Sequence, residues 1–124
     1  MSTFQGREAE NAASDYLKLQ KLIIVDQNWR TRWCEIDIVA QSSEKIGLIK
    51  RAKIIHFVEV KYRASVAQGD GLEYITQKKQ LQMQRAAEFW VNEHSWSGDY
   101  QLDAVAVTGY EGSWEFDYRP NITL

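Results

Sequence analysis

The sequence predicts a single α/β domain over residues 1–124, with a mixed sheet flanked by helices in the order αβββαβ. Two observations support this fold class. Apolar residues recur at the helical period in two segments, and they alternate or run together, as in strands, in several others. A chain of 124 residues that is 44% hydrophobic suits one domain with a modest core.

The first half of the chain predicts one helix followed by three strands. The helix is marked by an apolar stripe with the spacing i, i+3, i+4, i+7, i+8, made of Ala9, Ala12, Ala13, Tyr16 and Leu17. A strand starts at residues 22–25 and runs toward Trp29. Two more strands are expected at 34–40 and 54–63, joined by a polar, basic connection over residues 41–53.

The second half predicts another helix and two strands. Thr76 is a suitable N-cap for a helix that reaches about Glu93. The apolar stripe of this helix is Met83, Ala86, Ala87 and Trp90. Residues 102–108 have the composition of a buried strand, and the alternation over 114–118 is typical of a half-exposed last strand.

Composition limits the compartment. The single Cys34 excludes an internal disulfide and fits a reducing environment. The apolar run 22–25 is far shorter than the roughly 20 residues that a membrane span needs. The first residues, which include Arg7 and Glu8, lack the apolar core of a signal peptide. We therefore expect a soluble cytoplasmic protein that does not enter membranes.

Charge is distributed unevenly along the chain. The net charge is −2, but residues 18–85 hold 13 of the 15 Lys and Arg and only 7 of the 17 Asp and Glu, which gives that stretch a charge of +6. A basic middle with acidic ends can present a positive groove to phosphates. A solvated, non-functional surface explains the same pattern equally well.

Two strands carry charged residues where a buried strand needs apolar ones. At the two-residue strand period, Asp37 shares a face with Glu35, and Glu59 shares a face with Lys61 and Arg63. Asp37 and Glu59 are candidate ligands for a hard cation such as Mg²⁺ or Mn²⁺. Lys61 could orient an attacking water or neutralise a phosphorane-like transition state. The alternative is an ordinary sheet face with cross-strand ion pairs, which spacing alone favours.

Two helical residues point toward the same sheet. Glu10 lies about 20° from Leu17 on a helical wheel, at the border of the inward stripe. Lys79 lies on the inward stripe of the second helix, in the first turn, where the helix dipole disfavours a cation. An anionic partner would explain Lys79, and so would snorkelling of its long side chain past the sheet edge.

Six ordered blocks of the sequence, over roughly residues 6–108, resemble the YraN family of uncharacterised endonuclease-like proteins. The blocks are Gly6-Arg-Glu-Ala-Glu10 with Ala13, Tyr16 and Leu17; Asn28-Trp29-Arg30; Glu35-Ile-Asp-Ile-Val-Ala40; Phe57-Val-Glu-Val-Lys61 with Arg63; Thr76 and Lys79 with Ala86-Ala87; and Leu102-Asp103 with Val105-Ala-Val107. The chain departs from the family at Ala9 and Cys34, where glycine is usual. Glycine often marks a positive φ that Cys34 would resist.

The resemblance implies a restriction-endonuclease-like core, similar to archaeal Holliday-junction resolvases. On that likeness the active site is Glu10, Asp37, Glu59 and Lys61, with Glu10 an auxiliary ligand or structural acid. The resulting hypothesis is a metal-dependent nuclease that cuts DNA, in branched or single-stranded form. Its phosphate contacts would be Arg30, Arg32, Arg63 and Lys79.

Two alternatives to this nuclease hypothesis concern function. One is a nucleic-acid-binding accessory protein that keeps the fold without cleaving, and a weaker one is a domain that binds a protein partner. Resolvases act as dimers because they cut two strands, so a homodimer is one hypothesis for the assembly. His56 is expected to have a packing or surface role, and Asp103 a structural one.

Overall fold

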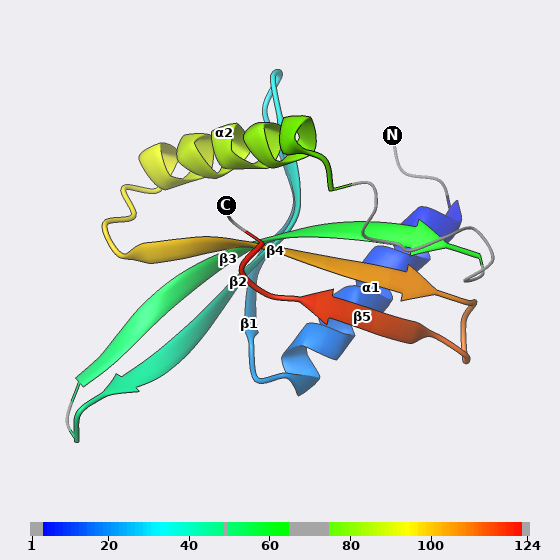
Figure 1. The fold of residues 1–124 in the computed structure, drawn as a ribbon, viewed down its shortest axis with the longest axis horizontal. Helices are drawn as coiled ribbons and strands as arrows, with labels where there is room; N and C mark the ends of the chain where they lie inside the picture. Colours follow the sequence, from blue (N-terminus) through cyan, green and yellow to red (C-terminus); the bar gives the residue numbers. More distant parts are fainter. Residues whose placement is uncertain (1–3, 49, 65–74, 123–124) are drawn as a thin grey trace.

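A computed structural model describes residues 4–48, 50–64 and 75–122, which form two helices and a five-stranded sheet (Figure 1). The elements are α1 (Phe4–Leu19), β1 (Ile23–Arg30), β2 (Glu35–Ile46), β3 (Lys50–Arg63), α2 (Gln77–Glu93), β4 (Asp99–Thr108) and β5 (Glu115–Arg119). The strand order is β1-β2-β3-β4-β5, and β3 pairs with β4 in parallel while the other neighbours are antiparallel. The predicted α/β fold, with a mixed sheet and the order αβββαβ, is confirmed.

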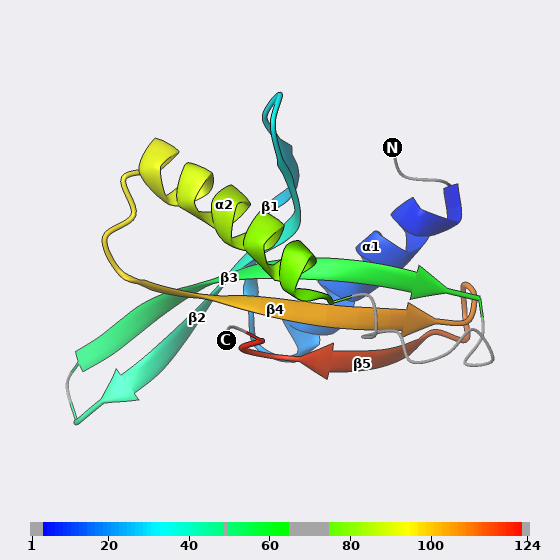
Figure 2. The same ribbon diagram turned by 45° about the horizontal axis from the view of Figure 1, so that its top comes forward.

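The two helices cover opposite faces of the sheet, as the two views in Figures 1 and 2 show. On one face the stripe of α1, centred on Ala13 and Leu17, packs against buried side chains of the central strands such as Val58 and Val105. On the other face α2 places Met83 and Trp90 on a second apolar cluster. The small alanines of both stripes let the helices approach the sheet closely, so both cores exclude water.

The start of α2 is fixed as the sequence predicts. Thr76 has an extended backbone, and its Oγ1 accepts a hydrogen bond of 3.1 Å from the Lys79 backbone N–H. This cap places Lys79 in the first helical turn. No helix in the described part of the chain is long and apolar enough to cross a membrane.

The prediction that residues 41–53 form a connection between two strands is wrong. Strands β2 and β3 continue through it as a ribbon, with pairing from Gln41↔Ile55 to Ile46↔Lys50, and the ribbon projects beyond both helices (Figure 1). Backbone hydrogen bonds between two strands do not require an apolar face, so a polar sequence can form such a ribbon. Polarity in this segment was therefore no sign of a loop.

Candidate active site

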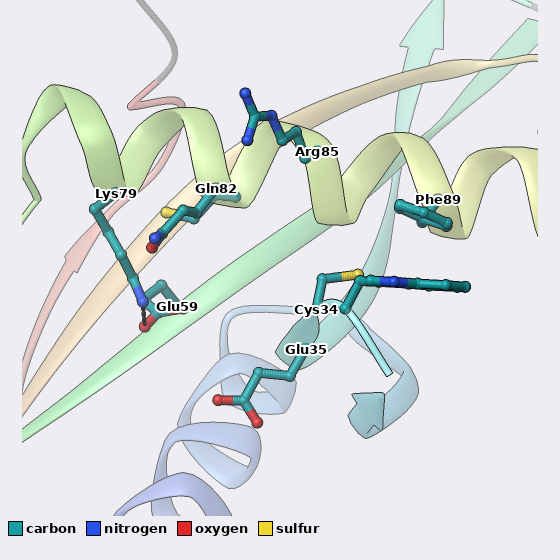
Figure 3. A pocket seen from close by; sticks show the side chains of 9 residues that line it. Cys34, Glu35, Glu59, Lys79, Gln82, Arg85 and Phe89 are labelled. Atoms are coloured by element: carbon teal, nitrogen blue, oxygen red, sulfur yellow. Dashed lines mark ion pairs between the residues drawn. The ribbon is translucent and has the colours of Figure 1, made fainter. Parts of the chain in front are cut away.

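A groove of about 470 Å³ lies between α2 and the start of β2, with β3 beneath it (Figure 3). Helix α2 contributes Lys79, Gln82, Met83, Arg85 and Phe89, the segment before and within β2 contributes Trp33, Cys34 and Glu35, and β3 contributes Glu59. In Figure 3 Lys79 reaches from the helix down to Glu59, while Phe89 lies two to three helical turns further along α2. The groove therefore has a charged end and an aromatic end.

The charged end is built where β2 separates from β3. Pairing between these strands begins at Ile38↔Val58, so Asp37 is the residue just before it. Beyond that point the Val60 N–H has no strand partner on β2, and it donates instead to the Asp37 Oδ2 at 2.8 Å. The departure of β2 thus holds the Asp37 carboxyl against β3, close to the site of Glu59.

Glu10 reaches the same point from α1. Its side chain is buried, as its position on the helical wheel predicted, and it lies beside the side chains of Asp37 and Asn28. Two ionised carboxyl groups at close range repel each other, which favours a proton on one of them. Burial raises the pKa of Glu10 above its ordinary value.

Asn28 is a neighbour of Asp37 that the sequence gave no role. Gln27 pairs with Ile38 and Trp29 with Ile36, which sets Asn28 across from Asp37. Its φ of 55° lies in the left-handed region, which asparagine tolerates better than most residues. The strand therefore bends at Asn28 in a way that presents its side chain to Glu10.

Asp37 and Glu59 are partly buried acids that lose solvation in the fold. Burial raises the pKa of Asp37 to about 7 against the hydrogen bond from Val60, and the charges of Glu10 and Glu35 add to the rise. Burial also raises the pKa of Glu59 to about 7, and the charge of Asp37 adds to it. Glu59 is therefore harder to ionise because Asp37 is near.

One cation already compensates this cluster. Lys79 Nζ lies 2.9 Å from Glu59 Oε1, and the ion pair opposes the rise in the pKa of Glu59. The anionic partner that the position of Lys79 suggested is thus a residue of the same chain. Both side chains are largely shielded from solvent, at 33% and 17% exposure, so the attraction is less screened than at a surface.

Of the predicted site residues, only Glu59 and Lys79 line the groove; Asp37 and Glu10 lie beside its charged end, and the remaining basic residues lie around it. Lys61 is exposed, two residues beyond Glu59 on the same strand, and Arg63 is half-buried at the end of β3. Arg30 forms an exposed ion pair of 3.5 Å with Glu35 and lowers the pKa of Glu10 through its charge. Arg32 is exposed, with its guanidinium 5.5 Å from the centre of the Trp33 ring.

The donor set suits a cation bound by few protein ligands. Within the described residues, no three His, Cys, Asp or Glu side chains are arranged to hold one metal ion together. Mg²⁺, however, usually takes only one or two carboxylates and keeps its remaining waters. Glu10 Oε2 is buried without a hydrogen-bond partner, and two further acids nearby have raised pKa values. Asp37 and Glu59 are therefore the residues that could hold a divalent ion here.

Apart from Lys79, sequence reasoning missed the helical wall of the groove. Gln82, Arg85 and Phe89 follow Lys79 at spacings of 3, 3 and 4 residues, so all four share one helical face next to the apolar stripe. That spacing was available as a signal. Trp33 has no comparable signal, because the position of its loop relative to α2 cannot be read from the sequence.

Cys34 does not have the positive φ that the usual glycine at this position of the resembled sequence blocks suggests. It is absent from the described residues with positive φ, and its N–H donates to Thr31 Oγ1 at 3.1 Å. The substitution is therefore accommodated without backbone strain, and the thiol side chain lines the groove.

A second buried acid, Asp103, lies away from the groove. His56 Nδ1 is 2.7 Å from Asp103 Oδ2, and Ser42 Oγ is 2.6 Å from His56 Nε2. Three further donors bond to Asp103: the side chains of Tyr118 and Gln101 and the backbone of Asn121. Burial acts to raise the pKa of Asp103, but these hydrogen bonds outweigh it and the pKa falls below its ordinary value. Both residues thus have the structural environment expected of them.

Comparison with known proteins finds one family over most of the chain. Residues 9–107 match the family described as "Uncharacterised protein family UPF0102". A UPF0102 protein of Vibrio campbellii is 33% identical over 114 residues, covering 88% of this chain and 86% of the relative. Another from Vibrio cholerae is 31% identical over 109 residues, covering 86% and 82%. A third, from Herpetosiphon aurantiacus, is 27% identical over 124 residues, covering 96% and 93%.

Proposed function

The chain belongs to the UPF0102 family, the YraN family that its sequence blocks resemble, and from this premise we propose that it is a metal-dependent nuclease that hydrolyses phosphodiester bonds in DNA. The observation that carries the proposal is the neighbouring pair of partly buried acids Asp37 and Glu59, with the Asp37 carboxyl held against β3 by the Val60 N–H at 2.8 Å and both pKa values raised to about 7. A fold gains nothing in stability from placing two such acids together. Neighbouring acids with raised pKa values are characteristic of functional sites.

The acids are suited to Mg²⁺ or Mn²⁺. Asp37 and Glu59 would hold the ion, and Glu10, whose Oε2 has no hydrogen-bond partner, would support it. A bound ion would offset the repulsion between the Glu10 and Asp37 carboxyl groups. When bound, such an ion stabilises negative charge on a scissile phosphate and lowers the pKa of a coordinated water.

The basic residues around the groove would hold the DNA backbone. Lys79 and Arg85 line the groove and would contact phosphates on either side of the scissile one. Lys61, on the same strand as Glu59, would orient the attacking water or neutralise charge in the transition state. Arg30, Arg32 and Arg63 would contact phosphates further out.

A second candidate function is binding without cleavage. Lys79 already neutralises Glu59 at 2.9 Å, as an internal cation would in a protein that has no metal. In that case the groove would bind DNA through its basic residues, and the acids would serve only to position Lys79. A cytoplasmic location, where DNA is found, and a homodimer that cuts two strands are parts of the nuclease proposal.

The deciding experiment is cleavage of a panel of labelled single-stranded, duplex, forked and four-way DNA with Mg²⁺ or Mn²⁺. We expect cleavage by the natural protein, and a loss of about 100-fold or more in Asp37→Asn and Glu59→Gln, because each removes a ligand charge. Glu115→Gln is the matched control, since it removes the same charge from an exposed position on β5. Size-exclusion chromatography with light scattering measures the oligomeric state.

A thermal-shift series with EDTA, Ca²⁺ and Mn²⁺ tests metal binding apart from turnover. Mn²⁺ should raise the melting temperature of the natural protein and of Glu115→Gln, and should leave Asp37→Asn unchanged. Salt-dependent DNA binding without cleavage, equal in Glu59→Gln and the natural protein, would establish the accessory function instead.

A further inference from the structure

The aromatic end of the groove holds two large rings at the surface. Trp33, from the turn between β1 and β2, stacks on Phe89 of α2 with ring centroids 5.8 Å apart and planes inclined by 18°. Trp33 is nevertheless 72% exposed and Phe89 43% exposed. Both residues line the groove that also contains Glu59. Much of the area of both rings is thus open to a further partner.

The turn that carries Trp33 is held in one conformation. Thr31 Oγ1 accepts hydrogen bonds of 3.1 Å from the backbone N–H groups of Trp33 and Cys34. The Thr31 N–H donates to the Cys34 carbonyl at 2.9 Å, which closes the turn. The indole is therefore presented from a fixed backbone, so little ordering entropy opposes binding to it.

The charges near the rings suit a nucleic acid. The Arg32 guanidinium lies 5.5 Å from the centre of the Trp33 ring, which shows that the indole accepts a flat cationic group. Arg85 lines the groove between Lys79 and Phe89 along the helix (Figure 3). A groove of about 470 Å³ is within the range of sites for small molecules, so it has room for a nucleotide unit.

The geometry points to a stacking subsite for an unpaired base of the DNA substrate, formed by Trp33 and Phe89. The base would lie on these rings while its backbone runs past Arg85 toward Asp37 and Glu59. A base inside a duplex has both faces covered by its neighbours, so only single-stranded or unpaired DNA can use the subsite. The inference rests on the proposed function and adds to it a preference for single-stranded and branched DNA.

The test is binding of the full chain to a fluorescent 12-nucleotide single strand and to a blunt duplex of the same sequence, in EDTA so that no cleavage occurs. Base–aromatic stacking predicts that Trp33→Ala weakens single-strand binding by about 5- to 150-fold and leaves duplex binding within about 2-fold. Phe89→Ala should show a smaller loss with the same selectivity. Trp33→Phe, which keeps an aromatic face, should restore most of the affinity.

Tyr110→Ala is the matched control, because Tyr110 is 70% exposed in the turn between β4 and β5 and does not line the groove. It should change neither affinity. Equal losses on both DNA forms, no change in Trp33→Ala, or no single-strand binding by the natural protein would overturn the subsite. Because the assay needs no metal and no turnover, the nuclease proposal can fail while the subsite stands, and the reverse is also true.

Discussion

Two carboxyl groups of one sheet have very different surroundings. Asp103 on β4 is fully buried and is bonded to His56, Tyr118, Gln101 and the Asn121 backbone, and its pKa falls. Asp37 on β2 is partly buried and receives one backbone donor, from Val60; loss of solvation and the nearby acids Glu10 and Glu35 raise its pKa to about 7. The same chain therefore compensates Asp103 fully and leaves Asp37 in need of a cation.

The contrast separates a structural acid from a functional one. A charge that only supports a fold is stable when every lone pair has a donor, as at Asp103. A charge kept beside other acids is unfavourable to the isolated protein and becomes favourable when a ligand cation arrives. Asp103 is the more deeply buried of the two, and yet its hydrogen-bond partners keep its pKa low.

The largest expected effect is a loss of stability on substitution of Asp103, the acid whose charge is compensated. Asp103→Ala leaves His56 and several donors buried without their acceptor, so we expect the free energy of unfolding to fall by about 3–5 kcal/mol at pH 7. Urea denaturation followed by circular dichroism measures it. The pKa of Asp103 is lower in the folded protein, so the stabilisation is present above about pH 4 and is lost as the pH falls through the folded pKa.

The control for Asp103 is Asp117→Ala on β5. Asp117 forms an ion pair of 2.9 Å with Arg119, and both side chains are about half exposed. An exposed pair of this kind contributes at most about 1 kcal/mol. A similar loss in both variants would show that the Asp103 network is not a special stabilising feature.

The second expected effect is a gain in stability on substitution of Asp37, the acid without a compensating cation. Asparagine can replace protonated Asp37, since its oxygen can accept from the Val60 N–H and its amide can donate to Glu10. We therefore expect the free energy of unfolding of Asp37→Asn to be about 1–2 kcal/mol higher than that of the natural protein at pH 8 without metal. Thermal and urea unfolding in EDTA measure the difference.

The stability difference between Asp37→Asn and the natural protein should depend on pH. The folded pKa of Asp37, about 7, lies above its ordinary value of 3.8, so the folded state binds more protons between these values. Stability of the natural protein therefore falls as the pH rises from about 4 to about 7 and is level above. The advantage of Asp37→Asn should grow over the same window. A difference that does not vary with pH, or a less stable variant at pH 8, would contradict the assignment.

Most of the fold was predictable because each element has a local signature. The stripes of α1 and α2 and the Thr76 cap follow from helical period and capping chemistry. The paired ribbon over residues 41–53 was not predictable, since its hydrogen bonds are made by backbone and its sequence is polar on both faces. Periodicity reports burial, and Ser43, Glu44 and Lys53 of this ribbon are exposed.

The sequence predicted which acids lie together, but it did not predict the residues that pair with them. The period-2 pattern and helical phase selected Asp37, Glu59 and Glu10, which the fold does bring together. The ion pair between Lys79 and Glu59 depends on how α2 crosses β3, which no local pattern encodes. His56 was seen as a lone residue because Asp103, its partner, is 47 positions away.

The smallest expected effect concerns the one cation within the acidic cluster. Lys79→Gln removes the charge 2.9 Å from Glu59, so the ionised carboxyl loses its compensation and the pKa of Glu59 should rise further above about 7. The loss of stability at pH 8 should be no more than about 1 kcal/mol, because Lys79 is one-third exposed. Carbon-13 NMR titration of the Glu59 carboxyl measures the pKa directly.

Lys78→Gln is the matched control, because Lys78 is exposed, precedes Lys79 on the same helix and does not line the groove. It should leave the titration of Glu59 in place, since a screened surface charge has little influence over that distance. If Lys79→Gln also leaves the midpoint unchanged, the ion pair contributes no compensation in solution. Glu59 would then be as uncompensated as Asp37, and the contrast with Asp103 would extend to the whole acidic cluster.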